Sequence, residues 1–297
     1  MSVIERAIKK LQSARDGARP GAVAPISYGT LVGGAAARRL DSASVSATVP
    51  ARRIMIDQNA LRAAGLLPPE QQDKALAEQY RRIKRPLIAS ALGRGTQRLA
   101  HGNLIMLASA MPGEGKTFTS LNLAFSMTLE EDTRVLLVDA DVAKPHISKL
   151  LGVESEPGLL DALRDAKLDV ESLILQTNVP GLSVLPAGKQ SENATELLAS
   201  IRMQDLFSRM SERDPLRIVL FDSPPLLLTT ESLALAQALG QIVLVVCAEK
   251  TPQKVILDAL GSLGQAKPIS LVLNQSVRKP HSGYYYKYQD ASGSSVS

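Results

Sequence analysis

Residues 104–125 read LIMLASAMPGEGKTFTSLNLAF, and this stretch decides the fold. The apolar run at 104–108 has the length of a buried strand and ends at Pro112-Gly113. From residue 119 onward, apolar side chains recur at helical spacing. The stretch therefore predicts a strand, a glycine-bearing loop and a helix, in that order.

The loop supplies the groups that a nucleoside triphosphate requires. Backbone N–H groups lie at a helix N-terminus, Lys116 suits the β- and γ-phosphates, and the Thr117 hydroxyl suits Mg²⁺. The strict P-loop pattern begins with glycine where this chain has Ala110, and we interpret the alanine as a tolerated small variant. The alternative to a P-loop is a turn that carries a lysine and happens to precede a helix. The predicted ATP-binding residues here are Gly113, Glu114, Gly115, Lys116, Thr117 and Phe118.

Two further apolar runs end in aspartates. Residues 134–141 read RVLLVDAD, which places Asp139 and Asp141 at the carboxyl end of a buried strand, where ligands of open α/β sheets bind. Residues 217–222 read RIVLFD, a Walker B pattern in which Asp222 would hold Mg²⁺ through water. Carboxylates one residue apart suit a metal site and a base for a hydroxyl proton. A helix cap at Asp141 and a plain strand end at Asp222 are the alternatives.

The alternation of strands and helices predicts an α/β fold. It is the P-loop NTPase type, a mostly parallel sheet with helices on both faces and a flexible N-terminal extension. Pro86 is expected to kink or end the first long helix. Further strands are expected at 182–185, 242–248 and 269–273, and further helices at 71–92, 195–212, 232–239 and 251–263.

Cysteine and histidine usage excludes two classes of site. Cys247 is the only cysteine, so no internal disulfide forms, and its apolar surroundings predict a buried, inert thiol. His101, His146 and His281 are isolated, so no zinc site is expected. No apolar run reaches the ~18 residues of a membrane span and the N-terminus lacks a signal-peptide core, so we expect a soluble, cytoplasmic protein.

Charge divides the chain unevenly. Residues 1–101 contain 17 Lys/Arg against 7 Asp/Glu, a net of +10, whereas residues 102–297 contain 17 against 22, a net of −5. Anionic lipid, nucleic acid and an acidic protein surface are all compatible with such a basic region, and its few aromatic residues make nucleic acid the least favoured partner. We interpret residues 1–69 as a basic, largely flexible extension, with a short amphipathic helix at 3–11, a linker at 13–50 and order resuming near Glu70.

The C-terminal tail, residues 281–297, contains a tyrosine cluster. Four of the six tyrosines lie within five residues, in a polar segment that a core cannot use, so they are expected to be exposed and available for modification or binding. The candidate phosphorylation sites are Tyr284, Tyr285, Tyr286 and Tyr288. Residues 70–280 are then the expected catalytic domain.

Together these features resemble the bacterial tyrosine kinases of polysaccharide export, and most closely their stand-alone, exosortase-associated type. The resemblance covers roughly residues 70–290 and is carried by SAMPGEGKT, LLVDADVAKP, VLFDSPP and the tyrosine cluster. A weaker match is the oligomerisation motif E-x-x-R-x-x-R, represented here by Glu78, Arg81 and Lys84. Lysine at position 84 lacks the bidentate fork of arginine. Ala143, followed by Lys144, stands where the family commonly has arginine.

The resemblance implies an ATP- and Mg²⁺-dependent protein-tyrosine autokinase. The tail of one subunit would enter the active site of its neighbour in a homo-oligomeric ring that loosens after phosphorylation. Lys116 would stabilise the γ-phosphate, Asp139 would accept the tyrosine proton, and Asn274 would contact the base. The implied metal-associated residues are Thr117, Asp139, Asp141 and Asp222.

The resemblance also implies partners and a place in the cell. A membrane activator of the chain-length-determinant type would hold the kinase at the inner face of the cell membrane. Other tyrosine-bearing proteins of polysaccharide synthesis are further expected substrates, and exopolysaccharide export is the expected process under control.

Two other functions share this sheet and these motifs. A partitioning-type ATPase of the Min/Par group usually carries a signature lysine five residues before the P-loop lysine, where this chain has Met111. A nucleotide-dependent assembly scaffold without catalysis is the second alternative. The tyrosine cluster favours the kinase over both.

Overall fold

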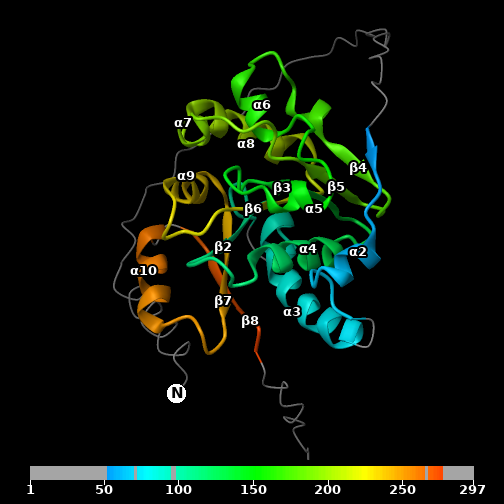
Figure 1. Cartoon of the computed structure of the whole chain (residues 1–297), viewed down its shortest axis with the longest axis vertical. Helices are drawn as coiled ribbons and strands as arrows, with labels where there is room; N and C mark the ends of the chain where they lie inside the picture. The colour runs from blue at the N-terminus through cyan, green and yellow to red at the C-terminus, as the bar shows by residue number, and fades with distance from the viewer. Residues whose placement is uncertain (1–51, 70–71, 95–97, 265–266, 277–297) are drawn as a thin grey trace, which may run out of the picture.

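The computed structural model describes residues 52–69, 72–94, 98–264 and 267–276 (Figure 1). These residues form the domain that carries the P-loop. The amphipathic helix expected at 3–11, the linker expected at 13–50 and the tyrosine cluster lie outside the described residues.

A single eight-stranded sheet forms the centre of this domain, in the order β1-β4-β5-β3-β6-β2-β7-β8. Every pairing is parallel except β4 with β5. The predicted mostly parallel α/β sheet is therefore confirmed. The strands are β1 Arg53–Ile54, β2 Leu104–Ser109, β3 Arg134–Asp139, β4 Leu175–Thr177, β5 Leu182–Leu185, β6 Arg217–Asp222, β7 Gln241–Cys247 and β8 Ile269–Asn274.

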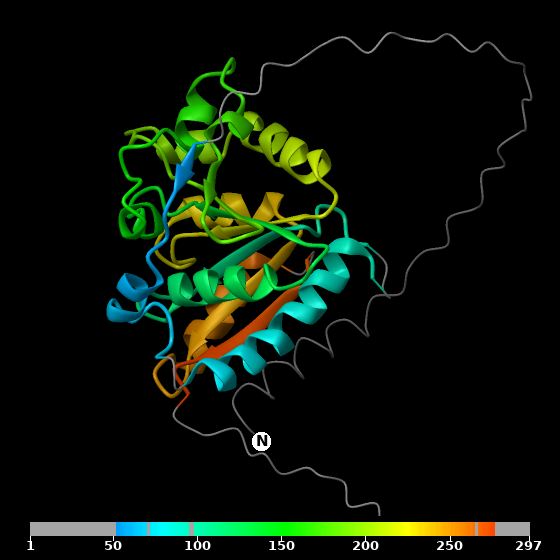
Figure 2. The same ribbon diagram turned by 90° about the vertical axis from the view of Figure 1, so that its right-hand side faces the viewer.

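Helices cover both faces of the sheet (Figure 2). In β2, Leu104 and Met106 belong to one apolar core and Ile105 and Leu107 to the other, as the two-residue period of a doubly buried strand requires. Helices α2–α5 contribute to the core that contains Ile105, and α6–α10 to the opposite one. The helices are α2 Gln58–Ala63, α3 Asp73–Leu92, α4 Lys116–Met127, α5 His146–Leu150, α6 Leu159–Arg164, α7 Ala194–Leu198, α8 Ile201–Arg213, α9 Thr230–Ala238 and α10 Gln253–Leu263, with a 3₁₀ turn η2 at Val170–Leu173.

Two helix predictions need correction in detail. Pro86 does not end the first long helix, because it lies on the exposed side of α3, where water can satisfy the carbonyl that loses its partner, while the expected kink stays a prediction. The helix expected at 195–212 is divided into α7 and α8. Ser200 adopts an extended conformation there, and its side chain caps α8 by accepting the N–H of Met203 at 3.3 Å.

The folded domain begins before the boundary expected near Glu70. Strand β1 pairs with β4, and the N–H of Ile56 donates to Asn178 Oδ1 at 2.8 Å. Further along, the Leu66 carbonyl accepts a hydrogen bond from Asn122 of α4 at 2.9 Å. Residues 52–69 therefore run from the sheet edge to the P-loop helix. The apolar side chains that they bury are Ile56, Leu61 and Leu67.

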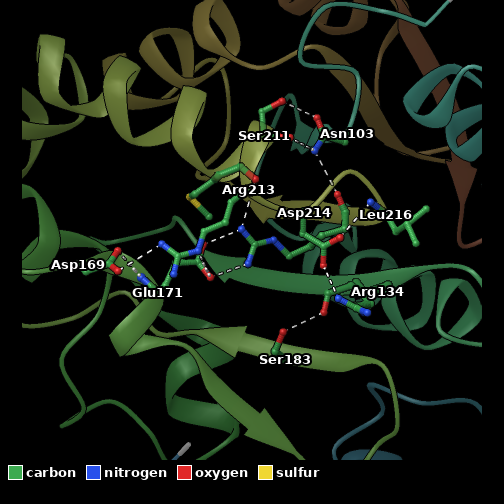
Figure 3. Close-up of polar contacts among 12 residues, drawn as sticks. Asn103, Arg134, Asp169, Glu171, Ser183, Ser211, Arg213, Asp214 and Leu216 are labelled. Carbon is green, nitrogen blue, oxygen red and sulfur yellow. Dashed lines mark hydrogen bonds and ion pairs between the residues drawn. The ribbon is translucent and has the colours of Figure 1, made fainter. Parts of the chain in front are cut away.

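A polar network fastens α8 and η2 to the amino ends of the central strands (Figure 3). Arg217 at the start of β6 forms a bidentate ion pair with Glu171 of η2, at 2.7 and 2.8 Å. Asn103 donates to the Ser211 carbonyl of α8 at 3.1 Å. Fork-to-fork Arg–carboxylate pairs fix geometry as well as charge. This network lies at the sheet edge opposite the carboxyl strand ends.

Lys84 of the expected oligomerisation motif is used inside the domain. It is only 3% exposed, and its ammonium donates to the Ser126 carbonyl at 2.5 Å and pairs with Glu130 at 2.8 Å. Ser126 lies in the last turn of α4, where carbonyls lack helical partners. The hydrogen bond from Lys84 holds the pKa of Glu130 below its usual range. Glu78 and Arg81, by contrast, form an exposed ion pair with each other.

Removing the Lys84 side chain should destabilise the domain. We expect Lys84→Ala to lower the free energy of unfolding by about 1–3 kcal/mol, because a carbonyl and a carboxylate lose their buried donor. The matched control on the same helix is Arg82→Ala, whose side chain is 79% exposed and lies 3.7 Å from Glu78. Its effect should stay within about 0.5 kcal/mol. Urea denaturation measures both, and equal losses would contradict the buried role of Lys84.

None of the helices in the described ranges combines the length and apolar character that a membrane span needs.

Candidate functional site

A cavity of about 1050 Å³ opens at the carboxyl ends of the central strands. Strands β2, β6 and β3 are adjacent in the sheet, so the loops that follow them meet at this edge. The lining residues are Leu66, Ser109, Pro112, Gly113, Glu114, Gly115, Lys116, Thr117, Phe118, Asp141, Ala143, Lys144, His146, Lys149, Leu150, Pro224, Pro225, Leu228 and Thr229. Every predicted loop residue from 113 to 118 is among them.

The P-loop conformation depends on its glycines. Gly113 and Gly115 have φ angles of +82° and +88°, in the left-handed region that side chains rarely adopt. A Cβ on Gly115 would also lie 2.0 Å from Asn274 Nδ2. Ala110 is completely buried and accommodated without a glycine, consistent with our interpretation of the variant motif.

Side chains from other loops support the P-loop from behind. The buried carboxylate of Glu114 accepts the N–H of Met111 at 2.7 Å and the hydroxyl of Thr251. Asn274 and Gln275, at the end of β8, donate to the carbonyls of Glu114 and Gly113 at 2.9 and 3.0 Å. Asn274 thus lies against the P-loop, while its expected contact with a base remains a prediction. Thr251 and Gln275 were missed because no local motif marks them.

Cys247 is buried at the end of β7, as predicted. Its thiol donates to Gln275 Oε1 at 3.2 Å. This contact makes the cysteine part of the packing behind the P-loop.

The Walker B aspartate binds the P-loop helix directly. One oxygen of the fully buried Asp222 carboxylate accepts from Lys116 Nζ at 2.8 Å and from Ser120 Oγ at 2.9 Å. Its other oxygen accepts from Thr117 Oγ1 at 2.9 Å, across 105 residues of sequence. The structure thereby brings together the predicted site residues Lys116, Thr117 and Asp222. Ser120 was missed, since a serine one helical turn after the motif is not distinctive by itself.

Asp139 is completely buried and is held by α5. Its Oδ2 accepts from the backbone N–H and the hydroxyl of Ser148, at 2.7 and 2.8 Å. Oδ1 has no hydrogen-bond partner within the described part of the chain. Burial, reinforced by the nearby carboxylates of Asp222 and Asp141, raises the pKa of Asp139 to about 7. Ser148 was not found from the sequence, because its contact depends on how α5 folds back on β3.

Asp141 occupies the wall of the cavity, unlike Asp139, which lies behind it. Its carboxylate accepts the N–H of Lys144 at 3.2 Å, one residue before the cap of α5, so it orders the turn after β3 and does not cap the helix. Burial raises the pKa of Asp141, and the positive charge of Lys116 opposes that rise. The structure therefore places Asp141 where a bound substrate can reach it.

The donor set suits Mg²⁺. Hydroxyl and carboxylate oxygens are the ligands that this hard cation prefers, and the unpartnered Oδ1 of Asp139 is a buried acceptor of that kind. No group of three or more His, Cys, Asp or Glu side chains in the described ranges is arranged to enclose a metal. Thr117, Asp139, Asp141 and Asp222 are the residues that would hold it, and the ion would neutralise charge on the β- and γ-phosphates.

The fold and these contacts define a P-loop nucleotide-binding domain. In agreement, the sequence family described as AAA domain matches residues 102–266, more than half of the chain.

Proteins with similar sequences identify the family to which this P-loop domain belongs. Tyrosine-protein kinase YwqD of Bacillus subtilis is 31% identical over 218 residues, which cover 72% of this chain and 87% of YwqD. Tyrosine-protein kinase ptk of Acinetobacter johnsonii is 34% identical over 187 residues, covering 62% of this chain. The chain therefore belongs to the bacterial tyrosine-protein kinase family. It spans only about a quarter of the length of ptk, since 25% of that relative is covered.

Solved structures agree with the sequence relatives. The kinase domain of VpsO is 30% identical and has a TM-score of 0.57, with 69% of this chain and 98% of that domain covered.

The buried Asp139 carboxyl should give the protein a distinctive pH dependence. Its folded-state pKa of about 7 lies above the ordinary 3.8, so the folded chain binds more protons between these values. The stability contributed by this group is therefore lost as pH rises through that range, by at most ~1.4 kcal/mol per pH unit. We expect Asp139→Asn to remove this slope, because an amide oxygen can accept both Ser148 bonds without charge.

Thermal denaturation between pH 5 and pH 8, in buffer containing EDTA, measures the effect. Asp258→Asn, at an exposed position of α10, is the control and should retain the slope of the parent chain. A parent and an Asp139→Asn variant with the same slope would show that Asp139 does not titrate in this range.

Proposed function

We propose that this chain is an ATP-dependent protein-tyrosine autokinase that phosphorylates its own C-terminal tyrosines. The observation that carries the proposal is the hydrogen-bonded set at the cavity, in which the buried Asp222 accepts from Lys116 and Thr117, with Asp141 in the cavity wall. Membership of a family whose relatives are named tyrosine-protein kinases supports the same chemistry.

The proposed reaction is an in-line phosphoryl transfer. The tyrosine oxygen attacks the γ-phosphorus, the bond to the β–γ bridging oxygen breaks, and ADP leaves. Lys116 stabilises the negative charge on the transferring group, and the backbone N–H groups of residues 113–117 bind the phosphates. Positioning and charge stabilisation account for most of the catalysis in such transfers.

The tyrosine proton goes to a carboxylate at the end of β3. Asp139 is the proposed acceptor, as the resemblance implies, and its pKa near 7 suits a proton transfer near neutral pH. Because its carboxyl is completely buried and does not line the cavity, the turn after β3 would have to open for the tyrosine oxygen to reach it. Asp141, which faces the cavity, is proposed to orient the metal-bound water. Asp222 is proposed to do the same from β6.

Transfer is proposed to occur between subunits of a ring. Glu78 and Arg81 are exposed on α3 and available to a neighbour, whereas Lys84 would have to leave Ser126 and Glu130 to take part. Each phosphate added to the tail carries nearly two negative charges, and the net charge of residues 102–297 is −5. Their mutual repulsion would loosen the assembly.

The cellular setting is also part of the proposal. A membrane protein of the chain-length-determinant type would activate the kinase and keep it at the inner face of the cell membrane. The basic residues of 1–101 would add attraction to anionic lipid. Control of exopolysaccharide synthesis and export, with other tyrosine-bearing proteins as further substrates, is the proposed role.

Incubation with Mg-ATP followed by intact-mass and peptide mass spectrometry tests the kinase. We expect phosphate only on Tyr284, Tyr285, Tyr286 and Tyr288, and none in Lys116→Met, because that variant loses the charge that stabilises the γ-phosphate. Lys254→Met, on the exposed surface of α10, is the matched control and should be phosphorylated like the parent. ATP hydrolysis without phosphotyrosine, even with the activator's cytoplasmic segment present, would favour the Min/Par-type switch. Absence of both activities would favour the scaffold.

Mixing two inactive partners tests transfer between subunits. One chain carries Lys116→Met and an intact tail, and the other has an intact site and all four tail tyrosines replaced by phenylalanine. We expect phosphate on the tail of the Lys116→Met chain, at a rate that rises with total protein concentration. An unmodified tail, beside a parent chain that labels itself, would establish transfer within one subunit instead.

A further inference from the structure

Three basic side chains line the cavity at α5, beyond the residues assigned to the nucleotide. Lys144, His146 and Lys149 are exposed there, and neither lysine ammonium has an ion-pair partner in the described part of the chain. We refer to these three residues as the α5 wall. The acidic groups of the same cavity are Glu114, which is bound to Met111 and Thr251, and Asp141. Asp141 faces His146 electrostatically, and the two lysines of the α5 wall are left without an ion-pair partner in the described ranges, so the wall carries an excess of positive charge.

The strand order places the α5 wall on the β3 side of the P-loop. The P-loop follows β2, and β3, which leads into α5, lies two strands away across β6. At about 4.8 Å per strand, this separation is on the order of 10 Å. On the other side of β2, β7 and β8 lead to Asn274, where the base is expected. The α5 wall thus lies beyond the γ-phosphate end of a nucleotide bound along the P-loop.

The cavity is large and extends from the P-loop to the α5 wall. Its volume of about 1050 Å³ lies at the upper end of the roughly 300–1,000 Å³ of small-molecule pockets. The space near the α5 wall is therefore available to the segment that accepts the phosphate.

We propose that the α5 wall binds a phosphotyrosine two positions from the tyrosine being phosphorylated, so that an already phosphorylated tail is the preferred substrate. The inference rests on the proposed kinase function and adds the class of substrate: a tyrosine peptide with a phosphate on a nearby tyrosine. Lysine and protonated or neutral histidine donate hydrogen bonds to phosphate oxygens, and no such anion is present in an unmodified tail.

The tail sequence fits this chemistry. Residues 282–290 read SGYYYKYQD, in which Lys287 and Asp290 cancel in charge. One phosphate adds a charge of about −1.5 to −2. In an extended peptide, side chains two positions apart point to the same side and lie roughly 7 Å apart along the chain. Tyr284, Tyr286 and Tyr288 have this spacing, so a phosphate on one of them would lie on the acceptor's side of the peptide, toward the wall. A first phosphate would therefore speed the next transfer, and the repulsion that loosens the assembly would follow only once several phosphates have accumulated.

Peptide binding tests the wall without requiring catalysis. The protein is the full chain with its four tail tyrosines replaced by phenylalanine, and the probes are fluorescein-labelled SGYYYKYQD peptides, unmodified or phosphorylated at the third tyrosine. Fluorescence anisotropy should show that the phosphorylated peptide binds roughly tenfold more tightly than the unmodified one. A tenfold change in affinity is what one additional charge-assisted hydrogen bond can supply. The double variant Lys144→Gln/Lys149→Gln should reduce this ratio to about one, and Lys254→Gln should preserve it.

The other outcomes overturn the inference. Equal binding of the two peptides by the parent chain, or a ratio that survives the double substitution, would exclude the α5 wall as a phosphotyrosine site. A double variant that instead loses affinity for Mg-ATP would assign the wall to the nucleotide. Thermal denaturation checks that the variants are folded. Since the readout is binding, a chain that binds the phosphorylated peptide selectively but transfers no phosphate would contradict the proposed kinase and leave the wall's specificity established.

Discussion

The buried carboxylate of Asp222 is the interaction on which the site depends. It accepts hydrogen bonds from Lys116, Thr117 and Ser120, and so joins the end of β6 to the first turn of the P-loop helix. A buried carboxylate without such donors would be costly, and a buried ammonium equally so. Each group thus makes the other's burial possible. The P-loop lysine is held in place by Asp222, the aspartate of the Walker B strand.

The sheet gives this small constellation its surroundings. Because β2 lies between β6 and β7, the nucleotide loop has carboxylates on one side and the polar end of β8 on the other. The β6 and β3 side carries Asp222, Asp139 and Asp141, and continues into the basic side chains of α5. The proposed chemistry divides along this edge of the sheet, with recognition of the base at the β8 end and transfer of the phosphate at the β3 end. The α5 wall, which follows β3, is proposed to contact the acceptor for the same reason.

Residues outside the motifs hold α5, the P-loop and α4 in place around the site. Ser148 ties α5 to Asp139, Glu114 and Gln275 support the loop, and Lys84 closes the end of α4. The use of Lys84 within the chain also bears on the E-x-x-R-x-x-R motif. Its last position has a packing role here, which leaves Glu78 and Arg81 as the exposed part of the motif.

The sequence alone determined the α/β class, the positions of the central strands and the nucleotide-binding loop. These are local properties: a doubly buried strand is a continuous apolar run, and Gly115 must be glycine at its φ of +88°. Tertiary structure alone decided that β1 and α2 join the domain, that Pro86 is accommodated, and that Asp139 is enclosed by Ser148 whereas Asp141 faces the cavity. Those outcomes depend on which distant segment covers a residue. Burial, pKa and the direction of a side chain arise only when segments separated in sequence pack together.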